Sequence, residues 1–200
     1  MYRRVLMVSV WILSLAPFCQ AALDVKVFVT QNFETGIPFE EAAAFGSSAV
    51  PELLVMLSDV QYEPYWGNII YTLGAIGDPL AVKSLEDFLK NHQGEISWNT
   101  FSALQGVPTA LGFIGEKGHV EALDLLARLT DDSYWKEARF AVFDNVTVND
   151  SVVRKSIMKS TVVALGYTGQ DQAIGTLETL KSQPEVMAEF GADINAAMNQ

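Results

Sequence analysis

A five-residue pattern, Leu-Gly-x-x-Gly, recurs along this chain of 200 residues. Its three copies begin at Leu73, Leu111 and Leu165. An aliphatic residue follows each copy at a fixed distance, and a weaker copy in 45–57 supplies a fourth. These aliphatic residues are Val50, Val82, Val120 and Ile174. Their spacings of 32, 38 and 54 residues indicate a repeated supersecondary unit that stacks on its neighbours.

Each copy has the features of a helix, a tight turn and a second helix. Apolar residues recur at helical spacing within 65–73 and again within 81–89. Gly77 suits the left-handed residue that ends a helix, because glycine has no Cβ to clash there. Asp78 suits the N-cap of the next helix, and Pro79 suits its first position. One hairpin cannot bury both apolar stripes, so the pattern predicts an all-α fold, an α-solenoid of about four stacked hairpins.

Two longer motifs extend this pattern. Residues 73–85 read Leu-Gly-x-x-Gly-Asp-x-x-Ala-Val-x-x-Leu, and 152–169 carry a first-helix pattern with Ile157 and either Val163 or Ala164 in apolar slots. On these motifs the chain resembles the HEAT-repeat family, including the HEAT-like repeats of phycobiliprotein lyases. The resemblance covers about 39–182. It implies an α-solenoid whose second helices line a concave face.

The segments around the copies are expected to be caps and an insertion. The domain prediction is a signal peptide at 1–21, an N-terminal cap at 22–45 and the HEAT-like array at 46–200. Within the array, an insertion at about 131–150 separates the third and fourth copies, and about 184–200 form a C-terminal cap helix.

Two local expectations follow from residue type. Val25, Val27 and Val29 alternate with other residues, so the start of the N-terminal cap is expected to be extended. Pro108 falls within the first helix of the third copy, which we expect it to kink or break.

The first 21 residues have the composition of a secretory signal peptide. Arg3 and Arg4 precede a mainly apolar stretch at 5–16, and small residues allow cleavage near Ala21. The apolar stretch is shorter than the roughly 20 residues that span a bilayer. We therefore expect a secreted or periplasmic protein without a stable membrane span after cleavage. An uncleaved anchor, or a lipoprotein with Cys19 as lipid acceptor, remains an alternative.

The charge of the chain restricts its partners. The signal segment holds two of the 13 basic residues and none of the 24 acidic ones, so cleavage lowers the net charge from −11 to −13. This charge opposes binding to nucleic acid or anionic lipid, because both require a positive field. Cleavage also removes the single cysteine, Cys19, so no disulfide is expected.

No catalytic or metal-binding motif emerges from the sequence. The glycine pairs lack the spacing and the Lys-Ser/Thr of a phosphate loop. His92 and His119 have no companion ligands, so both are expected to be solvated. The oxygen-rich segment 144–150 offers a loose calcium site, but it lacks the EF-hand order. We therefore expect no cofactor, no metal and no catalytic residues.

A candidate partner-binding surface lies on the outer side of the second helices. Helical geometry places charged residues and two apolar ones opposite the buried stripe. This surface comprises Val55, Lys83, Asp87, Lys90, Glu121, Leu125 and Arg128. Val55 and Leu125 are apolar where solvent is expected, which is typical of a contact site. The alternative is that the insertion or a cap covers them.

These observations favour an exported scaffold that binds a protein or peptide and is not an enzyme. The alternative is an enzyme or accessory protein like the phycobiliprotein lyases, which rests on resemblance of fold alone. A DNA-binding HEAT-like protein conflicts with the acidic charge.

Overall fold

The computed structural model describes residues 24–34, 36–142 and 148–199. The expected signal peptide and its cleavage site lie outside these residues. The described part is mostly helical, as predicted. Its α-helices are α1 (Val25–Val29), α2 (Phe39–Ala44), α3 (Val50–Ser58), α4 (Trp66–Ile76), α5 (Leu80–Asn91), α6 (Trp98–Glu116), α7 (Val120–Leu129), α8 (Asp150–Thr168), α9 (Asp171–Lys181) and α10 (Pro184–Ala197). Short 3-10 helices are η1 (Ser47–Ala49), η2 (Val60–Tyr65) and η3 (Asp132–Trp135).

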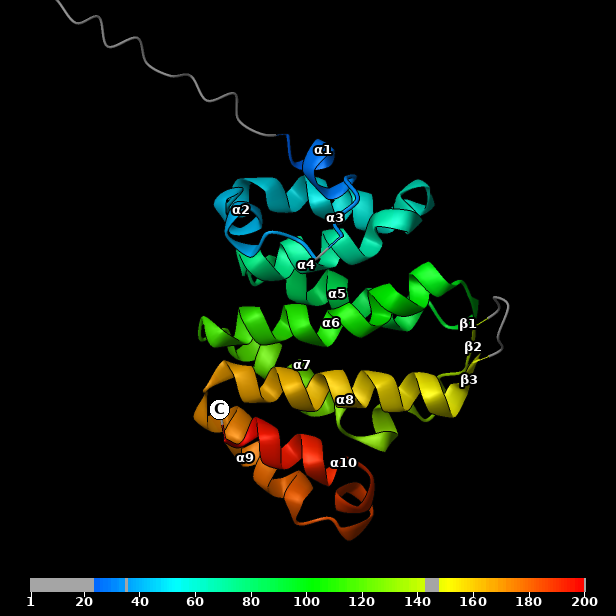
Figure 1. Cartoon of the computed structure of the whole chain (residues 1–200), viewed down its shortest axis with the longest axis vertical. Coiled ribbons are helices and arrows are strands. Elements are labelled where there is room, and N and C mark those ends of the chain that lie inside the picture. Colours follow the sequence, from blue (N-terminus) through cyan, green and yellow to red (C-terminus); the bar gives the residue numbers. More distant parts are fainter. Residues whose placement is uncertain (1–23, 35, 143–147, 200) are drawn as a thin grey trace, which may run out of the picture.

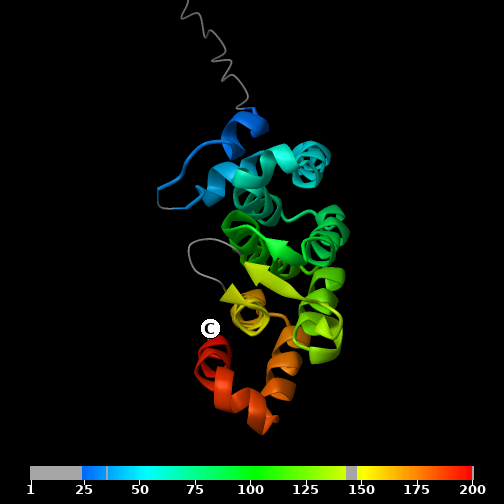
Figure 2. The same ribbon diagram turned by 90° about the vertical axis from the view of Figure 1, so that its right-hand side faces the viewer.

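Helices α4 and α5, α6 and α7, and α8 and α9 pair as hairpins, and the hairpins lie one on another (Figure 1). The first helices α2, α4, α6 and α8 pack in that order, and α10 packs against α8. The second helices α3, α5, α7 and α9 pack in a parallel row. Figure 2 shows the two rows edge-on as two layers. The apolar core lies between the rows and includes the leucine of each motif copy, Leu73, Leu111 and Leu165.

The first glycine of each motif copy allows neighbouring first helices to approach closely. The pairs in contact are Gly74 with Ala110, Gly112 with Ala164 and Gly166 with Ala197. A Cβ added at Gly74 would lie 2.6 Å from Cα and 2.9 Å from Cβ of Ala110. Carbon atoms prefer separations of about 3.5–4.0 Å, so a side chain here would force the helices apart. The recurring glycine therefore sets the short distance between neighbouring helices of this row.

The second glycine of the motif has the predicted role in two copies and not in the third. Gly77 and Gly169 end α4 and α8 with left-handed φ values of 70° and 60°. Gly115 has the same place in the motif as Gly77 but does not end its helix, because α6 continues to Glu116 and the left-handed residue is Gly118, with φ 87°.

The turn after α4 is held by two side chains. Asp78 Oδ1 accepts a 2.9 Å hydrogen bond from the Leu80 amide, but Pro79 is the N-cap and α5 begins at Leu80, so both residues lie one position earlier than predicted. Lys117, in the next turn along the stack, donates through Nζ to the Ile76 carbonyl at 2.6 Å. Consecutive turns are therefore bonded to each other as well as stacked.

One local expectation is wrong, and the helix break considered for another is absent. Val25–Val29 form a helix and no strand, because Asp24 Oδ1 caps it by accepting from the Lys26 amide at 2.8 Å. Pro108 does not break α6, which runs unbroken from Trp98 to Glu116. Pro108 is buried in a helix packed between α4 and α8, so tertiary packing outweighs the lost backbone bond.

The insertion forms a small sheet with the loop after α5. Strand β2 (Phe140–Val142) pairs in parallel with β1 (Gly94–Ile96) and antiparallel with β3 (Val148–Asn149). Its first part is η3, capped by Asp131, whose Oδ1 accepts from the Ser133 amide at 2.8 Å. The C-terminal cap is the predicted helix, α10. Within the described ranges, no helix is long and apolar enough to cross a membrane.

Candidate functional site

The structure exposes most of the predicted partner-binding surface, with one clear exception. Val55 is 67% exposed, and Lys83, Asp87, Lys90, Glu121 and Arg128 are exposed or half-exposed on α5 and α7. Leu125, however, is fully buried, so its assignment to this surface is wrong. The reason is that α7 contacts α5, α6, α8, α9 and η3, which together cover most of its circumference.

The charged residues on this surface largely neutralise one another. Lys83 pairs with Asp87 one turn along α5. Lys90 Nζ and Arg128 Nη1 both bind Glu86 Oε1, at 2.6 Å and 2.8 Å. Burial raises the pKa of Glu86, but the hydrogen bonds from Lys90 and Arg128 outweigh it and hold this pKa below its usual value. These pairs join α5 to α7 and leave few free charges for a partner.

The insertion covers part of the same surface. The Tyr134 ring of η3 lies 5.8 Å from Lys90 Nζ and 5.9 Å from the Arg128 guanidinium carbon, as measured to its centroid. Its hydroxyl is buried and has no hydrogen-bond partner among the described residues. Burial, and then the nearby Glu86 carboxylate, raise the pKa of Tyr134 to about 12. Residues 132–135 therefore form part of the wall of the second-helix row.

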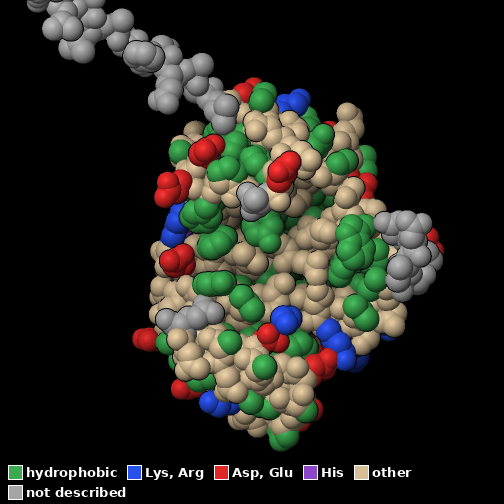
Figure 3. All heavy atoms as spheres, in the orientation of Figure 1, with side chains coloured by type: hydrophobic (Ala, Val, Ile, Leu, Met, Phe, Trp, Pro, Cys, Tyr) green, Lys and Arg blue, Asp and Glu red, His purple; other side chains and the backbone are tan. Residues whose placement is uncertain are grey.

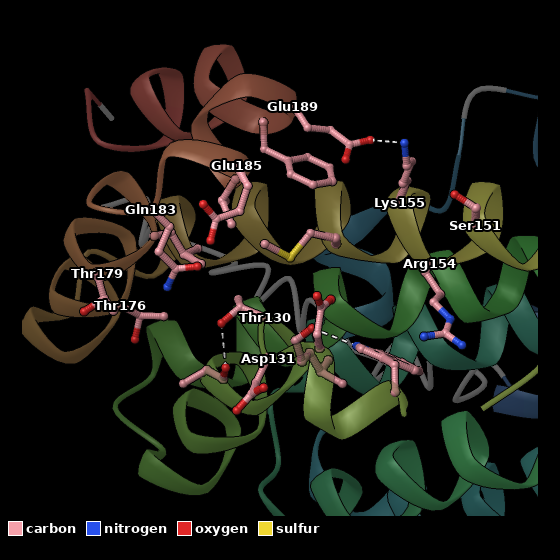
Figure 4. A pocket seen from close by; sticks show the side chains of 18 of the residues that line it. Thr130, Asp131, Ser151, Arg154, Lys155, Thr176, Thr179, Gln183, Glu185 and Glu189 are labelled. Carbon is pink, nitrogen blue, oxygen red and sulfur yellow. Dashed lines mark hydrogen bonds and ion pairs between the residues drawn. The ribbon is translucent and has the colours of Figure 1, made fainter. Parts of the chain in front are cut away.

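A pocket of about 930 Å³ opens beside this wall (Figure 4). It lies among the C-terminal ends of α7 and α9, η3, the N-terminal half of α8 and the first turns of α10. Its lining residues are Ala127, Leu129, Thr130, Asp131, Asp132, Trp135, Asp150, Ser151, Arg154, Lys155, Met158, Thr176, Thr179, Leu180, Gln183, Glu185, Val186, Glu189 and Phe190. No residue of the predicted surface lines it.

The pocket arises from unequal helix lengths. Helix α8 has 19 residues and α9 has 11, which correspond to about 28 Å and 16 Å of axis. The N-terminal half of α8 therefore extends past its hairpin partner. Trp135 is a buried residue of the lining and is fixed by a 3.0 Å hydrogen bond from Nε1 to the Leu129 carbonyl. Helix α10 returns along α8 and forms the outer wall.

The pocket has an apolar part formed by residues at helical spacing. Met158 of α8, Val186 and Phe190 of α10, and Leu180 of α9 contribute to it, together with Trp135. Met158, Val186 and Phe190 are half-buried in the chain as it stands. A ligand seated against them would remove further apolar surface from water.

Both basic side chains that line the pocket, Arg154 and Lys155, form ion pairs. Arg154 Nη2 binds Asp150 Oδ2 at 2.9 Å and also donates to the Ala138 carbonyl at 2.8 Å. Lys155 binds Glu189 across the gap between α8 and α10. A second, smaller hollow of about 350 Å³ shares this Lys155–Glu189 pair and Phe190 as a common wall.

The histidine and calcium-binding possibilities noted in the sequence do not come together as a site in the described residues. His92 is half-buried and not solvated as expected, with its ring 4.6 Å from that of Trp66 and Nδ1 3.0 Å from the Phe88 carbonyl. Of the possible calcium segment 144–150, only 148–150 lie within the described residues. No group of three or more potential metal-ligating side chains occurs in the described part of the chain.

Exposed aromatic side chains on the first helices form a further feature. Phe39, Tyr71, Trp98 and Tyr167 are each at least 40% exposed, and Phe39 packs edge-on against Phe113 at 4.8 Å. Figure 3 shows hydrophobic side chains scattered over this side of the molecule, with more of them in the upper half. None of these four aromatic residues lines the pocket of about 930 Å³.

Comparisons with protein-family models, with curated proteins and with solved structures find no match to this chain. A role for the pocket therefore has to be inferred from its own geometry and chemistry.

Proposed function

We propose that this protein is an exported α-solenoid of HEAT-like hairpins, and that it binds a peptide segment of a protein partner without catalysing a reaction. The binding site in this proposal is the pocket among α7, η3, α8, α9 and α10. Export, to the periplasm or the cell exterior, is supported by the signal-like composition of 1–21.

The hairpin order and the repeated glycine contacts support the solenoid part of the proposal. Each first helix packs on the next, and small residues recur at every crossing from α4 to α10. Such arrays bind partners along surfaces that successive repeats create together. The pocket has this character, because it needs the third hairpin, the fourth hairpin and the C-terminal helix at once.

The observation that carries the binding part is the composition of the pocket. Ligand sites commonly have volumes of about 300–1,000 Å³ and combine apolar walls with a few polar groups. The volume of about 930 Å³ lies in this range, and the lining combines Met158, Val186 and Phe190 with carboxylates, hydroxyls and one amide. These dimensions suit several residues of an extended peptide.

A peptide selection tests the proposal. The purified full chain is used to select from a phage library of random peptides, and the affinities of the selected peptides are measured by fluorescence anisotropy. Met158→Asp and Val186→Asp place a charge on the apolar wall and should weaken binding at least about tenfold. Ile174→Asp is the matched control, because Ile174 is 43% exposed on α9 and outside the lining.

Circular dichroism must show that each variant retains its helices before affinities are compared. If no peptide binds the wild-type chain, the proposal is wrong. It is also wrong if the selected peptides bind both pocket variants as tightly as they bind the control variant.

A further inference from the structure

More carboxylates line the pocket than its own basic side chains neutralise. Five acidic residues and two basic residues line it. Both bases already pair, Arg154 with Asp150 and Lys155 with Glu189. The remaining carboxylates, Asp131, Asp132 and Glu185, have no ion-pair partner among the described residues.

These three carboxylates come from two different walls. Asp131 and Asp132 lie in the turn from α7 into η3, and Glu185 lies in the first turn of α10. Figure 4 shows Asp131 and Glu185 on opposite sides of the pocket. A cationic group inside would therefore meet negative charge from both sides, which selects for sign more strongly than one rim charge does.

The helix ends do not reverse this sign. Helices α7 and α9 contribute C-terminal residues to the pocket, and α8 and α10 contribute N-terminal ones. The partial charges at these ends are opposite and about equal, so they offset one another. The side-chain carboxylates therefore decide the local potential, and the acidity of the whole chain, net −11, adds to it at longer range.

The apolar wall adds a second requirement. Met158 follows Arg154 and Lys155 by one turn of α8, and Val186 and Phe190 of α10 also line the pocket. Methionine adapts to ligands of different shape because its side chain is unbranched and polarizable. A ligand that satisfies the whole pocket therefore combines positive charge with bulky apolar groups.

We propose that the pocket recognises a cationic and apolar peptide segment, in which lysine or arginine residues neighbour large aliphatic or aromatic ones. This inference rests on the proposed peptide-binding function and specifies its ligand. Lysine or arginine side chains bind Asp131, Asp132 and Glu185, and the apolar residues pack on Met158, Val186 and Phe190.

Three capped hexapeptides test the two requirements separately. The first alternates leucine with lysine, the second leucine with glutamate, and the third serine with lysine. Exposed ion pairs contribute little individually, but three together should favour the leucine–lysine peptide over the leucine–glutamate one by about tenfold in Kd. The serine–lysine peptide should bind at least about tenfold more weakly, because it buries no apolar surface.

A pair of double variants locates the charge effect. Asp132→Asn with Glu185→Gln removes two pocket carboxylates and should weaken leucine–lysine binding about fivefold. Glu116→Gln with Glu178→Gln removes the same charge from exposed positions outside the lining and should leave Kd within about twofold. Raised salt should weaken binding to the wild type and narrow the difference between the two double variants.

Equal affinity for the lysine and glutamate peptides overturns the inference, and so does equal loss in the two double variants. Equal affinity for the serine–lysine peptide overturns its apolar half. In each case the proposed function stands if library-selected peptides still lose affinity in Val186→Asp. If neither the hexapeptides nor the library yields a ligand, both proposals fail.

Discussion

Replacing Gly74 by alanine tests the packing of the first-helix row directly. The added Cβ would lie 2.6 Å from Cα of Ala110, a backbone atom that cannot rotate away. Helices α4 and α6 must therefore separate by about 1 Å to restore normal contact. Overpacking of this kind costs about 1–3 kcal/mol, and we expect the upper part of that range. Alanine offsets about 1 kcal/mol through its helix propensity, so the net loss should be about 1–2 kcal/mol.

Gly67→Ala provides the matched control on the same helix. A Cβ at Gly67 meets nothing within 4 Å, so only the propensity gain remains. We expect this variant to be about 0.5 kcal/mol more stable than the wild type. Urea unfolding followed by circular dichroism measures both variants, with the slope m checked for constancy. If Gly74→Ala is as stable as Gly67→Ala, α4 and α6 are not in the contact described above.

Two further predictions concern the wall formed by η3. Tyr134→Phe should leave stability within about 0.5 kcal/mol or raise it, because the buried hydroxyl has no partner among the described residues. The variant should also lose the tyrosinate absorbance that develops near pH 12, because the pKa of Tyr134 is raised to about 12. An unchanged absorbance titration would show that Tyr134 is not the residue that titrates there. Glu86→Gln should cost about 1 kcal/mol at neutral pH by weakening the pairs with Lys90 and Arg128. Because the folded-state pKa of Glu86 is lowered from 4.5, this stabilisation is present above 4.5 and is lost as the pH falls through the lowered value. The unfolding midpoints of wild type and variant should therefore converge in acid, and a constant difference would exclude the proposed cause.

The hairpin fold was predictable because its signals are local. The helical spacing in 65–89, Gly77 in the left-handed region and the Asp78 hydrogen bond all follow from residue type within one turn. Gly115 shows the limit of this reasoning. It matches the motif, but α6 continues past it to Glu116, and Gly118 supplies the turn instead. The motif therefore predicts a glycine in the left-handed conformation only where the helix also ends at that glycine.

The candidate site was not predictable, since it depends on relations between distant elements. Leu125 occupies an outward position on an isolated helical wheel, yet neighbouring elements, η3 among them, cover most of the circumference of α7. The pocket itself requires α8 to be longer than α9 and α10 to return along α8. One signal was present in the sequence: the 54-residue spacing between Val120 and Ile174 marks the place where the repeat is interrupted.

The proposed function requires that a peptide binds in the pocket among α7, η3, α8, α9 and α10. Methyl NMR of the methionine-labelled chain tests this directly, because Met158 lines the pocket and Met56 is buried in α3 at the other end of the stack. The variant Met158→Leu assigns the Met158 signal. Adding a selected peptide should shift the Met158 methyl resonance along the same saturation curve as the anisotropy and leave that of Met56 unchanged. Saturable binding with an unmoved Met158 resonance would show that the peptide binds elsewhere.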